Sequence, residues 1–179
     1  MTRHDEILET AERLIRREGF NAVSYRDIAA KVGIKSASLH YHFPAKEDLG
    51  VAVVSRYHEK FHAALMAEAK DLPGPKDKLA AFIDLHRRAL HDDELLCLCA
   101  VLGAEAGGLP PSVVTAVKAF FTANIDWLSD VYSAMNVNGP ARRAKASAAA
   151  LEGALMTAMV NQDKDVFEAT ADWIMTPGA

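Results

Sequence analysis

The sequence predicts an all-α protein of about nine helices, and three observations support this fold class. Apolar residues recur three and four positions apart along almost all of the 179 residues, which is the spacing of one helix face. No stretch alternates apolar and polar residues as a half-buried strand does. Half of the residues are hydrophobic and a quarter are charged, which is typical of a globular domain.

Length and cysteine content exclude several classes of protein. The longest apolar run, Leu95 to Ala104, has ten residues, which is too short to cross a bilayer as a helix. Charged residues occupy the N-terminus, where a signal peptide has an apolar segment. Cys97 and Cys99 are too close in sequence to form a disulfide framework. We therefore expect a reduced, cytoplasmic protein.

The first two helices have clear start and stop signals. The first helix ends at Gly19, a typical C-cap residue, and its apolar face comprises Ile7, Leu8, Ala11, Leu14 and Ile15. Ser24 and Asp27 form a capping box that begins the second helix. Gly33 ends that helix after about two turns, since a sharp turn favours a residue without a Cβ.

A third short helix is predicted over residues 35–42, with Pro44 ending it. Two short helices joined by a tight glycine turn form a helix-turn-helix unit, and an ordinary αα-hairpin is the alternative. Leu39 and Phe43 are expected to face inward.

The remaining helices are separated by Pro- and Gly-containing breaks at 72–75, 107–111 and 136–140. The stretch 95–106 is apolar nearly all round, which predicts a helix buried on every side. The stretch 142–159 is rich in Ala, Gly and Ser, so another helix can approach it closely.

Charge is distributed unevenly along the chain. The net charge is −4, yet the first 46 residues hold eight Lys/Arg against six Asp/Glu. Any polyanionic partner is therefore expected at the N-terminal end.

The segment Val32–Leu49 resembles the DNA-binding signature of TetR/AcrR-type transcriptional regulators. It contains a glycine turn, a short polar helix, an aromatic cluster ending in Phe43, and the run Lys46-Glu47-Asp48-Leu49. Upstream positions that also match are Ala11, Phe20, Ser24, Asp27, Ile28 and Ala29. His40 departs from the pattern, since the family often has tyrosine there.

The resemblance implies a DNA-binding domain over residues 1–46 and an effector-binding and dimerisation domain over residues 47–179. It further implies a homodimer that binds a pseudo-palindromic operator in double-stranded DNA, and a small-molecule effector. No cofactor or membrane partner is expected.

The expected DNA contacts are polar or small side chains on the third helix and cations or hydroxyls at helix starts, where phosphates bind. These residues are Ser24, Arg26, Lys35, Ser36, Ala37, Ser38, His40, Tyr41 and Lys46. For His42, a partly buried position inside the domain is the favoured interpretation.

Aromatic and polar residues on apolar helix faces predict an effector pocket. The candidates are Tyr57, His58, Phe61, Phe82, His86, Cys99, Phe120, Phe121 and Trp127. The alternative is a packed core with satisfied histidines. His58 and His62 have metal-ligand spacing, but no further ligand lies near them in sequence, and no metal is expected. Glu105 is the one charge in its apolar stretch and requires a partner.

The two cysteines leave a second input open. Either thiol could sense oxidants or electrophiles covalently, and the alternative is that both are small buried hydrophobes.

Small and large apolar residues near the C-terminus are candidates for a dimer interface, with burial inside one subunit as the alternative. They are Ala148, Leu151, Leu155, Met159, Trp173 and Ile174. The combined interpretation is a ligand-responsive, dimeric transcriptional regulator, expected to be a repressor. A helical ligand-binding protein or enzyme is the remaining alternative, although no P-loop, nucleophile elbow or H-E-x-x-H motif is present. We expect no enzymatic activity.

Overall fold

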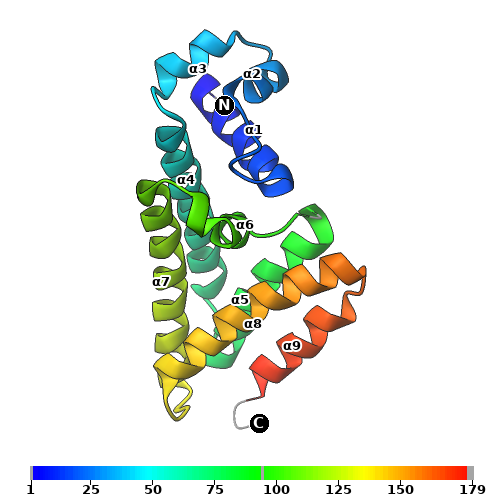
Figure 1. Cartoon of the computed structure of the whole chain (residues 1–179). Helices are drawn as coiled ribbons and strands as arrows, with labels where there is room; N and C mark the ends of the chain where they lie inside the picture. The colour runs from blue at the N-terminus through cyan, green and yellow to red at the C-terminus, as the bar shows by residue number, and fades with distance from the viewer. Residues whose placement is uncertain (1, 94, 177–179) are drawn as a thin grey trace. The chain divides into compact units, whose positions relative to one another are not determined.

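The computed structural model describes residues 2–93 and 95–176, and these residues form helices and connecting turns without any strand. The all-α prediction is confirmed (Figure 1). The α-helices are α1 (Arg3–Glu18), α2 (Tyr25–Val32), α3 (Ser36–His42), α4 (Lys46–Ala69), α5 (Pro75–Arg88), α6 (Leu98–Ala104), α7 (Pro111–Ala134), α8 (Pro140–Asn161) and α9 (Asp165–Met175). A π-helical turn, Ala89–Asp93, follows α5, and a 3-10 turn, Ala106–Gly108, follows α6.

The chain divides into two compact units. The first contains the residues up to Lys60 together with Leu98–Ala119, and the second contains Phe61–Cys97 and the residues from Phe120 onward. Helices α4 and α7 therefore contribute residues to both units. The functional boundary expected after residue 46 stays a prediction.

The first unit is built on the apolar face of α1. Ile7, Ile15, Ile28 and Leu39 are each at most 2% exposed, and burying side chains of this size stabilises the fold by about 1.5–3 kcal/mol each. Gly50 of α4 is also buried there. A Cβ on Gly50 would lie 2.7 Å from the Phe20 ring and 2.9 Å from a methyl of Val113, so only glycine fits this crossing without a shift.

The second unit has a larger apolar core formed by the end of α4 with α5, α7, α8 and α9. Its large buried side chains include Leu65, Leu79, Phe82, Leu128, Tyr132, Leu151, Phe167 and Ile174. The Tyr132 hydroxyl is paired with Ser147 Oγ at 2.7 Å, so this buried polar pair is satisfied.

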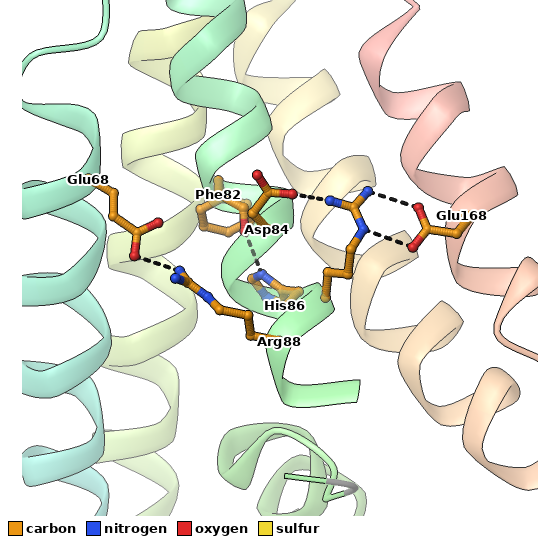
Figure 2. A network of polar contacts seen from close by, with 7 residues as sticks. Glu68, Phe82, Asp84, His86, Arg88 and Glu168 are labelled. Atoms are coloured by element: carbon orange, nitrogen blue, oxygen red, sulfur yellow. Dashed lines mark hydrogen bonds and ion pairs between the residues drawn. The ribbon is translucent and has the colours of Figure 1, made fainter. Parts of the chain in front are cut away.

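Arginine pairs connect α5 to two other helices of the second unit (Figure 2). Arg87 donates to both carboxylate oxygens of Glu168 on α9, each at 2.8 Å, and Arg88 donates to Glu68 on α4. The side chains of Arg87 and Glu168 are 34% and 40% exposed. Exposed pairs contribute only about 0–1 kcal/mol, so the core rather than these pairs determines stability.

The helix expected over 95–106 is shorter than predicted, and only part of it is buried. α6 contains seven residues, Leu98–Ala104, and Cys97 precedes it. Leu98, Cys99 and Leu102 are buried, whereas Gly103 and Ala104 are exposed. Apolar composition overestimated burial because glycine and alanine have little surface to bury. Within the described residues, no helix is long and apolar enough to cross a membrane.

Candidate functional site

A capping box begins α2, and a glycine turn leads from α2 into α3. The Ser24 N–H donates to the Asp27 carboxylate at 2.9 Å, and the Asp27 N–H donates to Ser24 Oγ at 3.3 Å. This capping box is confirmed, and its hydrogen bonds lower the pKa of Asp27. Gly33 has φ +75° and ψ +35°, the left-handed conformation that favours glycine. The turn thus directs the chain from α2 into α3, which packs on α2 (Figure 1).

The two faces of the α3 segment differ sharply in exposure. Leu39 is fully buried and Phe43 is 4% exposed, so their inward orientation is confirmed. Tyr41 is 86% exposed, which is unusual for a large aromatic residue. The other predicted contact residues here are Lys35, Ala37, Ser38 and His40, which are exposed, and Ser36, which is half-buried. The segment therefore presents a continuous polar surface above two apolar anchors.

Tyr25 stabilises the C-terminal end of α3 through hydrogen bonds. The sequence analysis did not predict this role. The buried Tyr25 hydroxyl donates to the carbonyl oxygens of Phe43 at 2.8 Å and Ala45 at 2.7 Å. Burial, followed by the nearby Asp48 carboxylate, raises the pKa of Tyr25 to about 12. The His40 ring lies 4.7 Å from the Tyr25 ring. Tyr25 therefore joins the start of α2 to the α3–α4 link.

The flanking candidates differ in availability. Ser24 and Arg26 are exposed at the start of α2. Lys46 is half-buried, and its ammonium donates to the Asn21 carbonyl at 3.3 Å and lies 4.7 Å from the centre of the Phe20 ring. Burial lowers the pKa of Lys46, while the nearby Glu105 carboxylate opposes that effect. Lys46 is thus engaged with its own unit.

Glu105 has the partner that the sequence analysis required. Its Oε2 accepts a hydrogen bond from the Phe20 N–H at 2.9 Å, so it caps the chain just beyond α1. Gly19, with φ +87°, leaves room for this carboxylate, since a Cβ there would lie 2.2 Å from Glu105 Oε1. The contact links the residue after α6 to the residue after α1, both within the first unit.

His42 is half-buried, as favoured from the sequence, and its ring lies 6.1 Å from the His4 ring.

Six of the nine effector candidates lie together in the second unit. Phe61 is 5.4 Å from both His86 and Phe120 between ring centroids, and Phe82 is 4.7 Å from His86. Trp127 stacks on Phe82 at 5.7 Å, and Phe121 lies 5.5 Å from Phe120. These six residues form an aromatic cluster. Phe82 and Phe120 are buried in it, as the packed-core alternative also expects, and the role of the cluster in effector binding stays a prediction.

The other three effector candidates belong to the first unit. Tyr57 and His58 are half-buried on α4, and the Arg16 guanidinium lies 6.0 Å from the Tyr57 ring centre. Cys99 is fully buried on α6. Neither Cys97 nor Cys99 forms a disulfide, and Cys97 is 3% exposed.

Glu152 stands beside the aromatic cluster and was missed by the sequence analysis. Its Oε1 lies 4.0 Å from His86 Nε2, and its side chain is 15% exposed. Burial, followed by the nearby Cys97 thiol, raises the pKa of Glu152 well above its usual range, and His86 opposes this effect. A usable signal was present, because Glu152 is the only charged residue between Lys145 and Asp163.

Two pockets of the second unit are lined by residues of the aromatic cluster. One of about 300 Å³ is lined by Phe121, Ile125, Lys145, Ala148, Ala149 and Glu152. Another of about 500 Å³ adjoins the α4–α5 link, and its lining includes Trp127, Lys70 and Asp130. Residues of the aromatic cluster thus reach both pockets.

The predicted dimer residues need a correction. Leu151, Leu155 and Ile174 are at most 1% exposed, and Ala148 is 9% exposed, within a single chain. Burial inside one subunit, the alternative explanation, describes these four residues because their apolar side chains fill the core of the second unit. Met159 is half-buried, and Trp173 is 40% exposed. The exposed apolar side chains on α8 are instead Met156 and Val160.

Comparison with known proteins identifies the family. The family model described as "Bacterial regulatory proteins, tetR family" matches residues 7–53. The crystal structure of a TetR transcriptional regulator from Legionella pneumophila is 33% identical, with a TM-score of 0.91, over 97% of this chain and 96% of that chain. A TetR-family regulator from Agrobacterium tumefaciens is 32% identical, with a TM-score of 0.90, over 97% and 95%.

A similar curated protein is the HTH-type transcriptional repressor NemR of Escherichia coli. It is 25% identical over 65% of this chain, and the aligned part spans 61% of NemR. The two solved structures carry the assignment, since the similarity to them extends over nearly the whole length of both chains. This chain belongs to the TetR family of helix-turn-helix transcriptional regulators.

Proposed function

We propose that the protein is a ligand-responsive repressor that binds a pseudo-palindromic operator as a homodimer and leaves it when a small molecule binds. The observation that carries this proposal is the α3 segment, where exposed polar residues and Tyr41 lie above the buried anchors Leu39 and Phe43. A recognition helix in the major groove needs these two faces. The relative NemR, named a repressor, supports the direction of control.

Residue chemistry supports a division of roles at the DNA. Lys35 has the reach and charge to donate to guanine O6 and N7, and the methyl of Ala37 suits contact with a thymine methyl. Ser24 and Arg26, exposed at the start of α2, suit phosphate contacts that set the register. Lys46 is assigned a lesser part, since its ammonium already contacts Asn21 and Phe20.

The dimer is assigned to α8 and α9. Met156, Val160 and Trp173 are 51%, 78% and 40% exposed, and such apolar exposure is costly in water unless another surface covers it. A second copy of the chain supplies a matching surface under two-fold symmetry. Light scattering tests this assignment: the wild type is expected at the mass of two chains, and Val160→Asp at a lower mass.

Effector control requires that the ligand bind one arrangement of the dimer more tightly than the other. The aromatic cluster of the second unit and its pockets supply a binding region of suitable chemistry. The alternative covalent input through Cys97 or Cys99 is less favoured. Both thiols are buried, and the carboxyl of Glu152 lies beside Cys97, whereas reactive thiolates prefer cationic and accessible surroundings.

Selection of bound sequences from random duplex DNA, at one fixed salt concentration, tests the proposal. The wild type is expected to enrich a palindrome, and Tyr41→Ala to lose or relax that enrichment. Lys118→Ala is the control, because it removes an exposed cation of α7 in the same unit. Absence of enrichment by a folded wild-type dimer would contradict the proposal.

A further inference from the structure

We propose that the effector is a small organic cation with N–H donors, held by the Glu152 carboxylate beside the aromatic cluster around His86. This inference rests on the proposed function, since it names the chemical class of the ligand. Four observations of the second unit carry it: an orphaned oxygen, the orientation of His86, a second orphaned acceptor, and a pocket.

The orphaned oxygen belongs to Glu152. Its Oε2 is buried and has no hydrogen-bond partner within the described residues. A buried acceptor without a donor destabilises a fold. The Cys97 thiol contacts the carboxyl group, yet Oε2 is left without a donor within the described residues, and a ligand N–H would supply one.

The orientation of His86 adds a second acceptor. Its Nδ1 lies 2.9 Å from the Phe82 carbonyl oxygen (Figure 2). A carbonyl only accepts, so Nδ1 carries the proton and donates. In the neutral ring Nε2 then has a free lone pair, which lies 4.0 Å from Glu152 Oε1. One nitrogen of a ligand can stand about 2.9 Å from both atoms and donate to each.

Asn124 contributes the second orphaned acceptor. It is 3% exposed on α7, and its Oδ1 is buried without a partner within the described residues. Asn124 lies one helical turn after Phe120 and one turn before Trp127, so it shares a helix face with two members of the aromatic cluster. Glu152 Oε2 and Asn124 Oδ1 are both acceptors that lack a donor within the described residues. An ammonium ion supplies N–H donors.

A pocket of about 300 Å³ lies beside Glu152. Glu152 lines it together with Phe121 and Ile125. This volume is at the lower end of the range for ligand sites, about 300–1,000 Å³, so the ligand is small. Aromatic rings attract cations through their faces, and Phe121 lies 5.5 Å from Phe120 of the cluster. Lys145 also lines the pocket but is exposed, so its ammonium can turn into water.

A cation and a neutral donor differ in proton balance. Because burial and the nearby Cys97 thiol raise the pKa of Glu152, the empty site favours the protonated carboxyl group more than water does. An ammonium ion that pairs with the carboxylate displaces that proton: the O–H bond of Glu152 breaks, the proton passes to the buffer, and the carboxylate accepts the ligand N–H. An alcohol leaves the proton in place.

Isothermal titration calorimetry of the full chain tests the proposal without DNA. The probes share one ring and differ in charge: benzylammonium, phenethylammonium, benzyl alcohol and benzoate. We expect at least one ammonium probe to bind at least tenfold more tightly than benzyl alcohol or benzoate. Titrations in buffers of different ionisation enthalpy are expected to reveal proton release, up to one per site.

Two variants assign the effect to one carboxyl group. Glu152→Gln keeps the shape of the side chain, and we expect it to weaken ammonium binding at least tenfold and to abolish proton release. Glu59→Gln makes the same change at an exposed position of α4 and should leave both unchanged. Thermal unfolding checks that each variant is folded.

Three results would overturn the inference: benzyl alcohol or benzoate binding as tightly as the cations, unchanged cation binding by Glu152→Gln, or no cation binding at all. DNA selection separates this failure from failure of the proposed function. A wild type that selects a palindrome but ignores cations refutes only this inference. One that binds cations but selects no DNA refutes the repressor.

Discussion

Two regions differ in how they place their polar groups. The recognition segment is the α3 segment, residues 35–43, and the proposed effector region is the aromatic cluster around His86 with Asn124 and Glu152. In the recognition segment, Lys35, Ser38 and Tyr41 are exposed, and the buried polar Tyr25 hydroxyl is fully used by two carbonyls. In the proposed effector region, Glu152 and Asn124 each have a buried oxygen without a partner among the residues that the structure describes. The recognition segment therefore exposes its polar side chains, and the buried hydroxyl that supports it is hydrogen-bonded. The proposed effector region instead buries polar oxygens among apolar side chains, and two of these oxygens lack a donor among the described residues. We expect a fixed backbone to favour DNA binding by the recognition segment. In the proposed effector region, we expect a bound ligand to donate hydrogen bonds to the unpaired oxygens.

Leu39→Ala is expected to have the largest effect and tests the rigidity of the recognition segment. Leu39 is fully buried, and removing its side chain leaves a cavity that costs about 2–5 kcal/mol of unfolding free energy. Chemical denaturation measures this loss. Ser38→Ala, one residue away and exposed, should change stability by less than about 0.5 kcal/mol. Equal stability of the two variants would remove the distinction between anchor and reading face.

The contrast between the regions also explains what the sequence could predict. The capping box at Ser24 and the glycines at 19 and 33 are short-range features, so the end of α1 and both ends of α2 followed from residues within a few positions of each other, as did the inward positions of Leu39 and Phe43. Helical spacing predicted the apolar faces that carry the aromatic residues, but spacing within one helix does not tell which faces meet.

The rest depends on contacts between residues far apart in the chain. Glu152 approaches His86, which is 66 residues earlier, and no local pattern encodes that pairing. Leu151, Leu155 and Ile174 look equally suited to a dimer interface and to a core, because composition does not tell which surface covers an apolar side chain. α6 was predicted too long for a related reason, since apolar residues at 95–97 pack without being helical.

Lys35→Ala should produce the next largest effect, on operator affinity rather than on stability. Loss of a specific base contact costs about 1–3 kcal/mol, and specificity relaxes at one base pair of each half-site. Fluorescence anisotropy with a selected operator measures it at fixed salt. Lys118→Ala, also an exposed lysine of the first unit, provides the control. If both variants lose affinity equally, Lys35 contributes only general charge.

Tyr25→Phe tests whether the hydrogen bonds of Tyr25 to the α3–α4 link contribute to stability and to operator binding. The variant removes the donor that serves the Phe43 and Ala45 carbonyls, and we expect a loss of about 1–2 kcal/mol of stability together with weaker operator binding. Tyr41→Phe removes a hydroxyl from a side chain that is 86% exposed and should leave stability unchanged. A stability loss in Tyr41→Phe but not in Tyr25→Phe would contradict this assignment.

Glu152→Gln should have a pH-dependent effect on stability. Because the folded-state pKa of Glu152 lies above its ordinary value of 4.5, its favourable contribution is present below that pH and is lost as pH rises. His86, Cys97 and the rim residue Lys145 are the other titratable groups at this site.

We therefore expect Glu152→Gln to gain stability relative to the wild type between pH 5 and pH 8. The gain grows by at most about 1.4 kcal/mol for each unit by which the pH rises between 4.5 and the raised pKa. Thermal unfolding across this range measures it, with Glu59→Gln as control. A wild type that gains stability relative to Glu152→Gln as pH rises would show that the carboxylate is satisfied as it stands.

We expect ligand binding in the proposed effector region to weaken operator binding. Operator affinity of the wild-type protein, measured by anisotropy with and without a saturating ammonium probe, tests it most directly. We expect affinity to fall at least about fivefold, which corresponds to a coupling free energy of about 1 kcal/mol, and Glu152→Gln to show no change. A wild-type dimer that holds its operator as tightly with the ligand bound as without it would contradict the account.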